Sequence, residues 1–500
     1  FFAMCGMYIL LMSLNSKFEI RNSKLSSWVG GVVFGLSGFF MARVWAGHVD
    51  VIAAASWMPW VFGLFLNLGT LTARPLRRGM VAAAGVFALQ LYAGYQTMAF
   101  FTVEAVGLAL IGQSIAGRSM RPFMRAFGAG LLGIGLAALQ IVPVQEFFLQ
   151  SIRTLPLSYE WISYGALTLP SLKQLFSPFF FGDQISYNGP PPNYPEHAMF
   201  VGVVALTLAI LVVLYGMVQR PKKYSALIFL FGFIAVGSLW VSLANHAPYD
   251  LQNLLWKLVP MYHYLRIPPR HLILFIFAAS VLVGLSLQMV RHTAIRIVLA
   301  LAIIAELVPF AKHFIATKPV PETRHNASLV ATLQKDQAPH RLLQNFGVWV
   351  SPRDSLDFDS AMPYRIFSAT GYDPSILRRY YEFIDAANGA TSPSILQHDV
   401  QVPYLNVGSR YTDFLNIKYI MVPRAYDPIG NTAPERLVRV EENAQQNYRI
   451  YENKTVLPRF YFVSQVRALP GRESVLETIR SGSLDVGKTV ILTSGDANNA

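Results

Sequence analysis

The sequence has 500 residues, of which 53% are apolar and only 14% are charged, and nearly uncharged runs of about 18 residues or more recur along it. This composition excludes a chain made only of soluble domains and predicts a polytopic α-helical membrane protein. The net charge is +13, yet the basic residues gather between apolar segments, which indicates topology rather than nucleic-acid binding. A single cysteine, Cys5, excludes a disulfide framework and a metal site built from cysteines.

Ten apolar segments are expected to form the membrane helices of residues 1–311. In chain order they lie near residues 1–14, 28–45, 49–69, 80–93, 96–114, 123–148, 199–218, 225–243, 271–290 and 297–311. The stretch 80–114 is too long for one crossing, and "YAGYQT" (92–97) is its plausible break. The first segment starts at Phe1 with no targeting peptide before it, so we expect the chain to begin inside a membrane segment.

The loops between these segments predict an orientation. On one side, loops 15–27, 70–79, 115–125, 219–224 and 291–296 carry 14 Lys or Arg and one acid, Glu19. The opposite loops carry six basic and five acidic residues. Because cytoplasmic loops are the ones enriched in Lys and Arg, the first set is expected inside. Loops 149–198 and 244–270 and the whole chain from residue 312 are then expected outside.

Residues 312–500 have the composition of a soluble domain, and we expect an extracytoplasmic mixed α/β domain there. Helical patterns at 374–387 and 472–481 alternate with strand-like "KYIMV", "RLVRV", "YRIYE", "RFYFV" and "TVILT". This domain is expected to recognise an acceptor molecule. The chain ends in "SGDANNA" without an evident closing element, so we expect the domain to be incomplete at its C-terminus.

The stretch "MYHYLRIPPRHLILF" (261–275) places Arg266, Arg270 and His271 directly before a long apolar run. The prolines prevent the two arginines from lying on one helix. One interpretation is interfacial anchoring, with the guanidinium groups in the lipid headgroup region. The other is a site for the phosphate of a lipid carrier, because the planar guanidinium suits phosphate. Both interpretations stay open.

Three carboxylates lie within apolar segments, each in the predicted outer half. Glu104, Glu146 and Glu306 are functional candidates because an unpaired carboxylate is costly in hydrocarbon. The alternative is that each is protonated or hydrogen-bonded and acts as a strut between helices.

A short predicted outward turn in "MARVWAGHVDVIAAASWMPW" (41–60) contains Arg43, His48 and Asp50. His48 is the candidate site residue of this turn, because a turn lets it face the nearby acid. The alternative is that His48 is a turn residue bonded to the backbone.

The loop 151–197 is rich in aromatic residues and proline, and we expect it to form a lid that lies on the membrane surface. Aromatic rings and nearby carboxylates suit sugar faces and hydroxyls, which makes Asp183 and Glu196 candidates. A capping role near the next helix start is an equally good interpretation of Glu196. The pattern "GAGLLG" (128–133) lies inside an apolar segment, so it predicts close helix packing and no dinucleotide site.

The order of several short stretches resembles the bacterial membrane protein family called YfhO. They are "AGH…WMPW", "AGYQTMAFF", "LQIVPVQEFFLQSIR", "LTLPSLKQLFSPFFFGD", "PEHAMFVGVVALTLAI", "LVPMYHYLRIPPRHLILF", "TGYDPSILRRYYEFI", "FLNIKYIMV" and "YRIYENKTVLPRFYFV". That family is similar to the GT-C glycosyltransferases. The resemblance therefore implies a GT-C-like helical bundle in the bacterial cytoplasmic membrane.

What the resemblance implies chemically is transfer of a sugar from a polyprenyl-phosphate carrier to an envelope polymer, lipid or protein on the outer face. It implies Arg266 and Arg270 at the carrier phosphate, and His48, Glu146, Arg153, Asp183 and Glu196 along an outer cavity. The catalytic acid of GT-C enzymes lies in the first outward loop, which is expected upstream of Phe1. Neither a metal nor a cofactor is expected, because arginines can offset the phosphate charge. The alternatives are a transporter or flippase of lipid-linked or envelope precursors, and a non-catalytic envelope-assembly protein.

Overall fold

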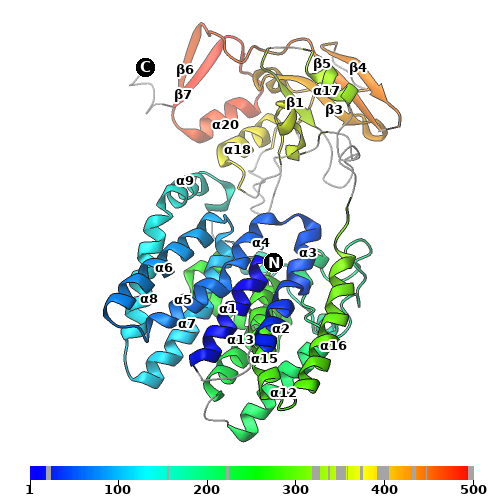
Figure 1. Cartoon of the computed structure of the whole chain (residues 1–500). Coiled ribbons are helices and arrows are strands. Elements are labelled where there is room, and N and C mark those ends of the chain that lie inside the picture. Colours follow the sequence, from blue (N-terminus) through cyan, green and yellow to red (C-terminus); the bar gives the residue numbers. More distant parts are fainter. Residues whose placement is uncertain are drawn as a thin grey trace. The chain divides into compact units, whose positions relative to one another are not determined.

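The computed structural model describes the chain in segments that together form two compact units. The described residues are 1–17, 24–154, 157–220, 224–317, 327–335, 338–344, 356, 358–371, 375–390, 405–430, 435–445 and 447–493. The first unit comprises Phe1–Pro143 and Pro156–Thr317, and the second comprises Val144–Leu155 and Lys318–Ala500. Figure 1 shows the first unit as helical and the second as mixed helix and sheet.

The first unit is a bundle of helices, and each of the ten predicted segments is helical. Its longer helices are α1 (Phe2–Lys17), α2 (Lys24–Gly35), α3 (Gly38–Ala46), α4 (Val49–Ser56), α5 (Met58–Leu68), α6 (Ala73–Tyr92), α7 (Gln96–Gly117), α8 (Arg121–Leu136), α9 (Ala138–Leu149), α12 (Val203–Gln219), α13 (Ser225–Leu243), α15 (Leu272–Met289) and α16 (Thr293–His313). The predicted break in "YAGYQT" is confirmed, since α6 ends at Tyr92 and α7 begins at Gln96. Gly94 lies in this break with φ of 94°, a conformation that favours glycine.

Several of these helices could cross a membrane. Within the described residues, five helical stretches are long and apolar enough: Val49–Leu68, Gln96–Gly117, Ser225–His246, Pro268–Met289 and Thr293–His313. Two bent pairs raise the number to seven if each pair is one span: Lys24–Gly35 with Gly38–Ala46, bent by 40°, and Arg121–Leu136 with Ala138–Leu149, bent by 75°. Shorter apolar helices are Phe2–Asn15 and Val203–Gln219. The chain is therefore consistent with several membrane crossings.

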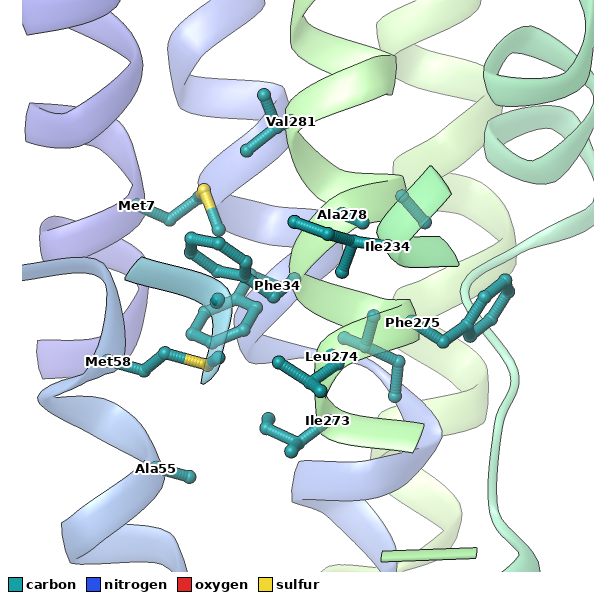
Figure 2. Close-up of a cluster of buried hydrophobic side chains, with 14 of the residues drawn as sticks. Met7, Phe34, Ala55, Met58, Ile234, Ile273, Leu274, Phe275, Ala278 and Val281 are labelled. Carbon is teal, nitrogen blue, oxygen red and sulfur yellow. The ribbon is translucent and has the colours of Figure 1, made fainter. Parts of the chain in front are cut away.

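Helix α15 lies at the centre of the helical unit, where every residue from Leu272 to Leu287 is buried. A helix that is apolar on all sides packs in the interior of a bundle, as this one does. Figure 2 shows Met7, Phe34 and Met58 in one cluster of buried side chains with Leu274, Ala278 and Val281 of α15. At Gly30 of α2, an added Cβ would lie 2.9 Å from the carbonyl oxygen of Ser280. Glycine at this position thus permits the close approach of α2 and α15.

The glycine pattern "GAGLLG" also serves packing, as predicted. An added Cβ at Gly133 of α8 would lie 3.0 Å from the carbonyl oxygen of Ala84 in α6 and 2.9 Å from the ring of Phe87. The two helices therefore approach closely at this glycine.

The second unit is built on a five-stranded mixed sheet in the order β2-β1-β3-β5-β4. The strands are β1 (Arg341–Gln344), β2 (Phe367–Ser368), β3 (Ile417–Pro423), β4 (Leu437–Asn443) and β5 (Tyr448–Asn453), and a separate parallel pair joins β6 (Gln465–Leu469) to β7 (Thr489–Thr493). Its helices are α17 (Ala327–Leu333), α18 (Arg378–Ala387), α19 (Tyr411–Phe414) and α20 (Arg472–Arg480). The mixed α/β prediction is confirmed within the described residues.

One of the predicted strands is wrong. The sequence "RFYFV" (459–463) alternates apolar and polar residues but forms no strand, and Phe460 and Phe462 are fully or almost fully exposed. Alternation alone predicts a side-chain pattern, whereas a strand also needs a neighbouring strand to accept its backbone hydrogen bonds.

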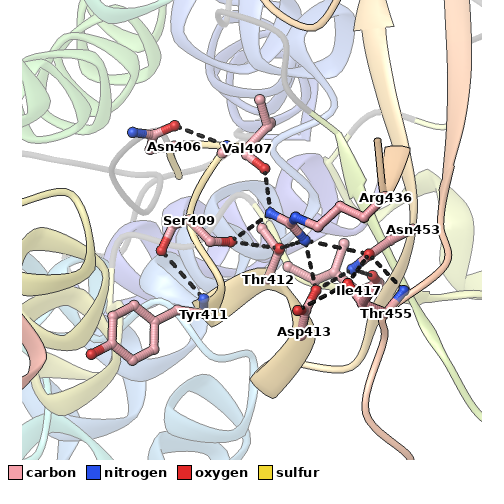
Figure 3. Close-up of polar contacts among 11 residues, drawn as sticks. Asn406, Val407, Ser409, Tyr411, Thr412, Asp413, Ile417, Arg436, Asn453 and Thr455 are labelled. Atoms are coloured by element: carbon pink, nitrogen blue, oxygen red, sulfur yellow. Dashed lines mark hydrogen bonds and ion pairs between the residues drawn. The ribbon is translucent and has the colours of Figure 1, made fainter. Parts of the chain in front are cut away.

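A buried polar network joins the sheet of the second unit to the loop before α19 (Figure 3). Arg436 donates to Asp413 Oδ1 at 2.7 Å and to the carbonyl oxygens of Val407 and Ser409, both at 3.0 Å. Asn453 Nδ2 donates to the same Asp413 oxygen at 2.7 Å. The side chains of Arg436 and Asp413 are only 10% and 7% exposed, so the pair depends on these contacts rather than on water.

The boundary of the two units differs from the predicted division at residue 312. Residues 144–155 belong to the second unit, although the sequence places them with the bundle and its loop. The N–H of Ile152 donates to the carbonyl of Ile376 at 2.9 Å, and the N–H of Arg378 donates to the carbonyl of Gln150 at 2.9 Å. The Ile152 side chain is buried with Ile376 and Tyr381. Pairing between segments so distant in sequence leaves no local pattern that could predict it.

Candidate functional site

Three loops predicted to lie on one side of the membrane meet at one end of the helical unit. There Glu196 forms ion pairs with two arginines, Arg43 of α3 and Arg270 of the short 3₁₀ helix Pro268–His271. Glu196 Oε2 lies 2.9 Å from Arg43 Nη2, and Glu196 Oε1 lies 2.8 Å from Arg270 Nη2. We call Arg43, Glu196 and Arg270 the buried triad.

Local sequence positions each member of the triad. Glu196 lies in the one-turn helix α11 (Tyr194–His197), where Asn193 Oδ1 accepts from the N–H of Glu196 at 3.3 Å. Arg43 lies in the last turn of α3, which ends at Ala46 and is followed by Gly47 with φ of 72°. Arg43 also donates to the carbonyl of Pro195 at 2.8 Å and stacks on the ring of Phe39 at 3.7 Å.

The triad is buried and carries one positive charge in excess. The exposed fractions of the side chains are 2% for Arg43, 7% for Glu196 and 22% for Arg270. Burial alone would raise the pKa of Glu196, but the charges of Arg270 and Arg43 outweigh it and lower that pKa to about 2. Glu196 is therefore ionised at neutral pH, and the triad keeps a net charge of +1.

Other polar groups lie within electrostatic range of the triad. His48 precedes α4 and is partly buried, and burial lowers its pKa, so it is neutral at pH 7. Burial also raises the pKa of the hydroxyl of Tyr95, the residue that directly precedes α7. The guanidinium of Arg270 lies 5.8 Å from the centre of the Tyr95 ring. The structure thus brings together Arg270, Glu196 and His48 of the predicted site residues.

Sequence reasoning missed Arg43 and Tyr95. The available signal was the position of Arg43 inside an apolar segment, where a lone arginine needs a partner. The expected capping role of Glu196 at the next long helix is not observed: its carboxylate bonds to two arginines, and the N–H of Val204 in α12 bonds to Glu306 instead. A contact of Glu196 with a sugar stays a prediction.

The guanidinium of Arg266 lies 6.0 Å from the centre of the Trp161 ring. As predicted, the two arginines do not share a helix: Ile267 between them adopts φ of 63° and ψ of 78°, and Pro268 follows. A β-branched residue in this left-handed region costs about 1–3 kcal/mol, so surrounding contacts hold the bend. The phosphate-binding role of Arg266 and Arg270 stays a prediction.

Asp183 closes a tight turn of the long loop. Its Oδ1 accepts hydrogen bonds from the N–H groups of Ile185 and Ser186 at 3.0 and 2.9 Å, and its Oδ2 lies 3.1 Å from Nε2 of His313. The hydrogen bonds from Ser186 lower the pKa of Asp183 to about 2. This geometry gives Asp183 a structural role in the turn, and its place in an outer cavity stays a prediction.

Glu146 and Arg153 are part of the second unit, while the triad is part of the first. Glu146 is exposed on α9, and none of that helix's residues is buried. Arg153 lies on a short 3₁₀ helix, Ile152–Thr154, and is partly buried. A cavity that these two residues share with His48 stays a prediction.

Glu306 acts as a strut. Its Oε2 accepts a hydrogen bond from the N–H of Val204 at 3.1 Å, at the start of α12. Gly202 precedes that helix with φ of 92°, and an added Cβ there would lie 3.0 Å from the same carboxylate oxygen. A carboxylate at a helix N-terminus is favourable because the first N–H groups of a helix lack partners within it.

Glu104 forms a second buried polar chain with Tyr262 and His271. The Tyr262 hydroxyl lies 3.0 Å from Glu104 Oε1 and 3.1 Å from His271 Nε2, while His271 Nδ1 lies 2.9 Å from the carbonyl of Pro268. Because a carbonyl only accepts, Nδ1 is protonated and donates. The Tyr262 hydroxyl has one proton and can donate to only one of its two neighbours. The other neighbour, either Glu104 or Nε2 of His271, must therefore carry a proton and donate to the hydroxyl oxygen. The chain therefore holds a proton that can reside at either end.

Replacing Tyr262 with phenylalanine is expected to destabilise the full chain by about 1–3 kcal/mol, because buried Glu104 and His271 both lose a hydrogen bond. Glu104 Oε2 already makes none to the described residues, so its carboxyl would be left without a partner. The measurement is thermal unfolding in detergent. Tyr249→Phe is the matched control, since Tyr249 is 59% exposed, and equal Tm values for the two variants would contradict the role of the chain.

In the part of the chain that the structure describes, no three His, Cys, Asp or Glu side chains lie close enough together to hold a metal ion. No protein-family model matches the sequence, and no curated protein matches it. The resemblance to the YfhO family therefore stays a prediction.

Proposed function

We propose that this protein is an integral-membrane, GT-C-like glycosyltransferase. It moves a sugar from a polyprenyl-phosphate carrier to an envelope polymer, lipid or protein on the outer face of the bacterial cytoplasmic membrane. The observation that carries the proposal is the buried triad, whose two arginines and one carboxylate leave a positive charge. The second unit is extracytoplasmic in this proposal and binds the acceptor.

The chemistry follows from the charge that develops during transfer. An acceptor hydroxyl oxygen attacks the anomeric carbon, the bond from that carbon to the phosphate oxygen breaks, and the hydroxyl proton passes to a carboxylate base. The departing lipid phosphate gains negative charge, which the excess charge of Arg270 and Arg43 and the guanidinium of Arg266 offset. We assign the base to no residue of this chain.

The orientation in this proposal rests on the Lys and Arg counts of the loops. This count assigns four loops or loop-flanking turns to a single side, and they contain Arg43, Tyr95, Glu196 and Arg270. Their convergence at one end of the bundle supports the alternation of loops on which the count depends.

A transporter or flippase of lipid-linked precursors is the second candidate. The chain of Glu104, Tyr262 and His271 favours it, because buried relays of ionisable groups occur in proton-coupled transporters. Such a protein would move the lipid-linked sugar across the membrane without breaking its glycosidic bond.

The test uses the protein, together with any sequence that precedes Phe1 in its gene, in proteoliposomes. The donors are a panel of polyprenyl-phosphate sugars that carry a radiolabel in the sugar, and the acceptors are envelope fractions. Release of polyprenyl phosphate with label in an acceptor is the expected result. Arg266→Met should lower kcat/KM about 10- to 100-fold, because a hydrogen bond to a charged group contributes about 1.5–3 kcal/mol. The control is Arg291→Met, an exposed arginine beyond the other end of α15.

Two outcomes would overturn the enzyme assignment. One is movement of the intact labelled lipid between leaflets with no bond cleavage, which favours the flippase. The other is that a folded protein neither transfers the sugar nor moves the labelled lipid with any donor of the panel.

A further inference from the structure

A cavity of about 820 Å³ lies within the second unit. Its walls come from the end of α9, the start of α18, α19 and the start of α20. All of its lining residues belong to the second unit, including Leu149 and Gln150 from the segment that joins this unit out of sequence order. The volume exceeds that of a small inorganic anion and suits the polar end of a larger ligand.

The cavity is basic. Arg378 Nε donates to Glu382 Oε1 at 2.8 Å, and Arg472 Nη2 pairs with the same oxygen. The Glu382 side chain is only 3% exposed, whereas those of Arg378 and Arg472 are 35% and 52% exposed and can reach a ligand. Arg379 also lines the cavity, is exposed and makes no ion pair with a described residue. Three arginines and one carboxylate give this wall two positive charges in excess.

Apolar side chains form much of the remaining lining, beside Gln150 and Tyr380. Leu149, Leu377 and Phe414 line it with exposed fractions of 63%, 43% and 43%. Leu149 is also the last residue of Ala138–Leu149, the second half of a bent helix pair that could cross a membrane. The apolar wall is therefore continuous along the chain with a candidate membrane helix.

We propose that this cavity binds a lipid phosphate, with the phosphate on Arg378, Arg379 and Arg472 and the hydrocarbon chain along Leu149 and Phe414. Guanidinium groups suit the phosphate, since each can donate two parallel hydrogen bonds to it. The adjoining apolar side chains select a phosphate that carries hydrocarbon over a free one. This assignment goes beyond the proposed function and does not require it.

The experiment measures binding to the full chain in an uncharged detergent. The probes are dihexanoyl phosphatidic acid, farnesyl phosphate, dihexanoyl phosphatidylcholine and inorganic phosphate. We expect saturable binding of one or both lipid phosphates, at least about tenfold tighter than inorganic phosphate, because burying several methylene groups is favourable. Which of the two binds more tightly identifies the source, a phospholipid or a polyprenyl carrier.

Charge reversal locates the site. Arg379→Glu should weaken binding of the lipid phosphate at least about tenfold, because it removes two hydrogen-bond donors and adds repulsion. It leaves the pairs of Glu382 in place, so an unchanged Tm shows that the variant is folded. Arg467→Glu, at an exposed arginine of β6 outside the cavity, is the matched control.

Three results would overturn the proposal: no saturable binding of either lipid phosphate, equal affinity for inorganic phosphate, or unchanged affinity of folded Arg379→Glu. The two proposals can be tested separately. Arg379→Glu tests lipid-phosphate binding in this cavity, and Arg266→Met tests binding of the donor phosphate in the proposed transfer reaction. Loss of binding in the first variant stands even if no sugar transfer is found.

Discussion

Replacing Glu196 with glutamine is expected to destabilise the full chain by about 3–5 kcal/mol, the typical cost of removing one partner from a buried ion pair. Glutamine keeps the size and an acceptor oxygen of Glu196, but it leaves Arg43 and Arg270 as like charges without a counter-charge. Both guanidinium groups bond to Glu196, at 2.9 and 2.8 Å. The expected result is a marked decrease in the Tm of the helical unit in detergent.

Glu160→Gln is the matched control, because Glu160 is an exposed acid of the same long loop. It should change the Tm little, as surface substitutions away from special features do. If Glu196→Gln were as stable as this control, the triad would not hold the loops at this end of the bundle together.

The pH dependence gives an independent measurement of the same pair. The pKa of Glu196 is lowered from 4.5 to about 2 in the folded protein, so its stabilising contribution is complete above the unfolded value. That contribution is lost as the pH falls from about 4.5 towards 2. The difference in Tm between wild type and Glu196→Gln should therefore shrink over this interval. A constant difference from pH 6 to 3 would contradict an ionised Glu196.

Arg436→Met is expected to destabilise the second unit by about 3 kcal/mol or more. Arg436 bonds to Asp413 and to the carbonyl oxygens of Val407 and Ser409 (Figure 3), and methionine can replace none of these contacts. Asp413 keeps hydrogen bonds from Asn453 and Thr455, which limits the loss. The measurement is chemical unfolding followed by a probe placed in the second unit.

Arg439→Met provides the control for that experiment. Arg439 lies in β4, which Arg436 directly precedes, is 54% exposed and pairs with Glu442 on the surface. Surface pairs contribute about 0–1 kcal/mol, so the control should unfold close to the wild type. Comparable losses in both variants would show that the network in Figure 3 contributes no more than a surface pair.

The elements of the fold follow well from the sequence because their patterns are local. Apolar runs predicted all ten helical segments, and the break at Gly94 follows from a stretch too long for one crossing. Strand patterns predicted β3, β4, β5 and β7 but also predicted a strand at 459–463, where the described residues form none. A local pattern thus predicts which positions are apolar, but it does not predict whether a neighbouring strand will pair with them.

The candidate site followed from the sequence only in part. Glu196 was a candidate because it lies in an aromatic loop, and Arg270 because it lies beside a long apolar run. Nothing in the sequence indicates that they bond to each other. Arg43 is hidden for the same reason, since its partner lies 153 residues away. The place of residues 144–155 in the second unit could not be predicted either, because it depends on backbone hydrogen bonds to residues 376 and 378.

That place of residues 144–155 has a consequence for biosynthesis. The chain passes between the two units three times, at Pro143, at Leu155 and at Thr317. The two units are therefore not two consecutive halves of the chain. A ribosome delivers residues 144–155 long before residues 376–378, and domains generally fold as they emerge. The backbone partners of Gln150 and Ile152 are therefore missing until the tail has been made, and this part of the second unit can only be completed late in synthesis.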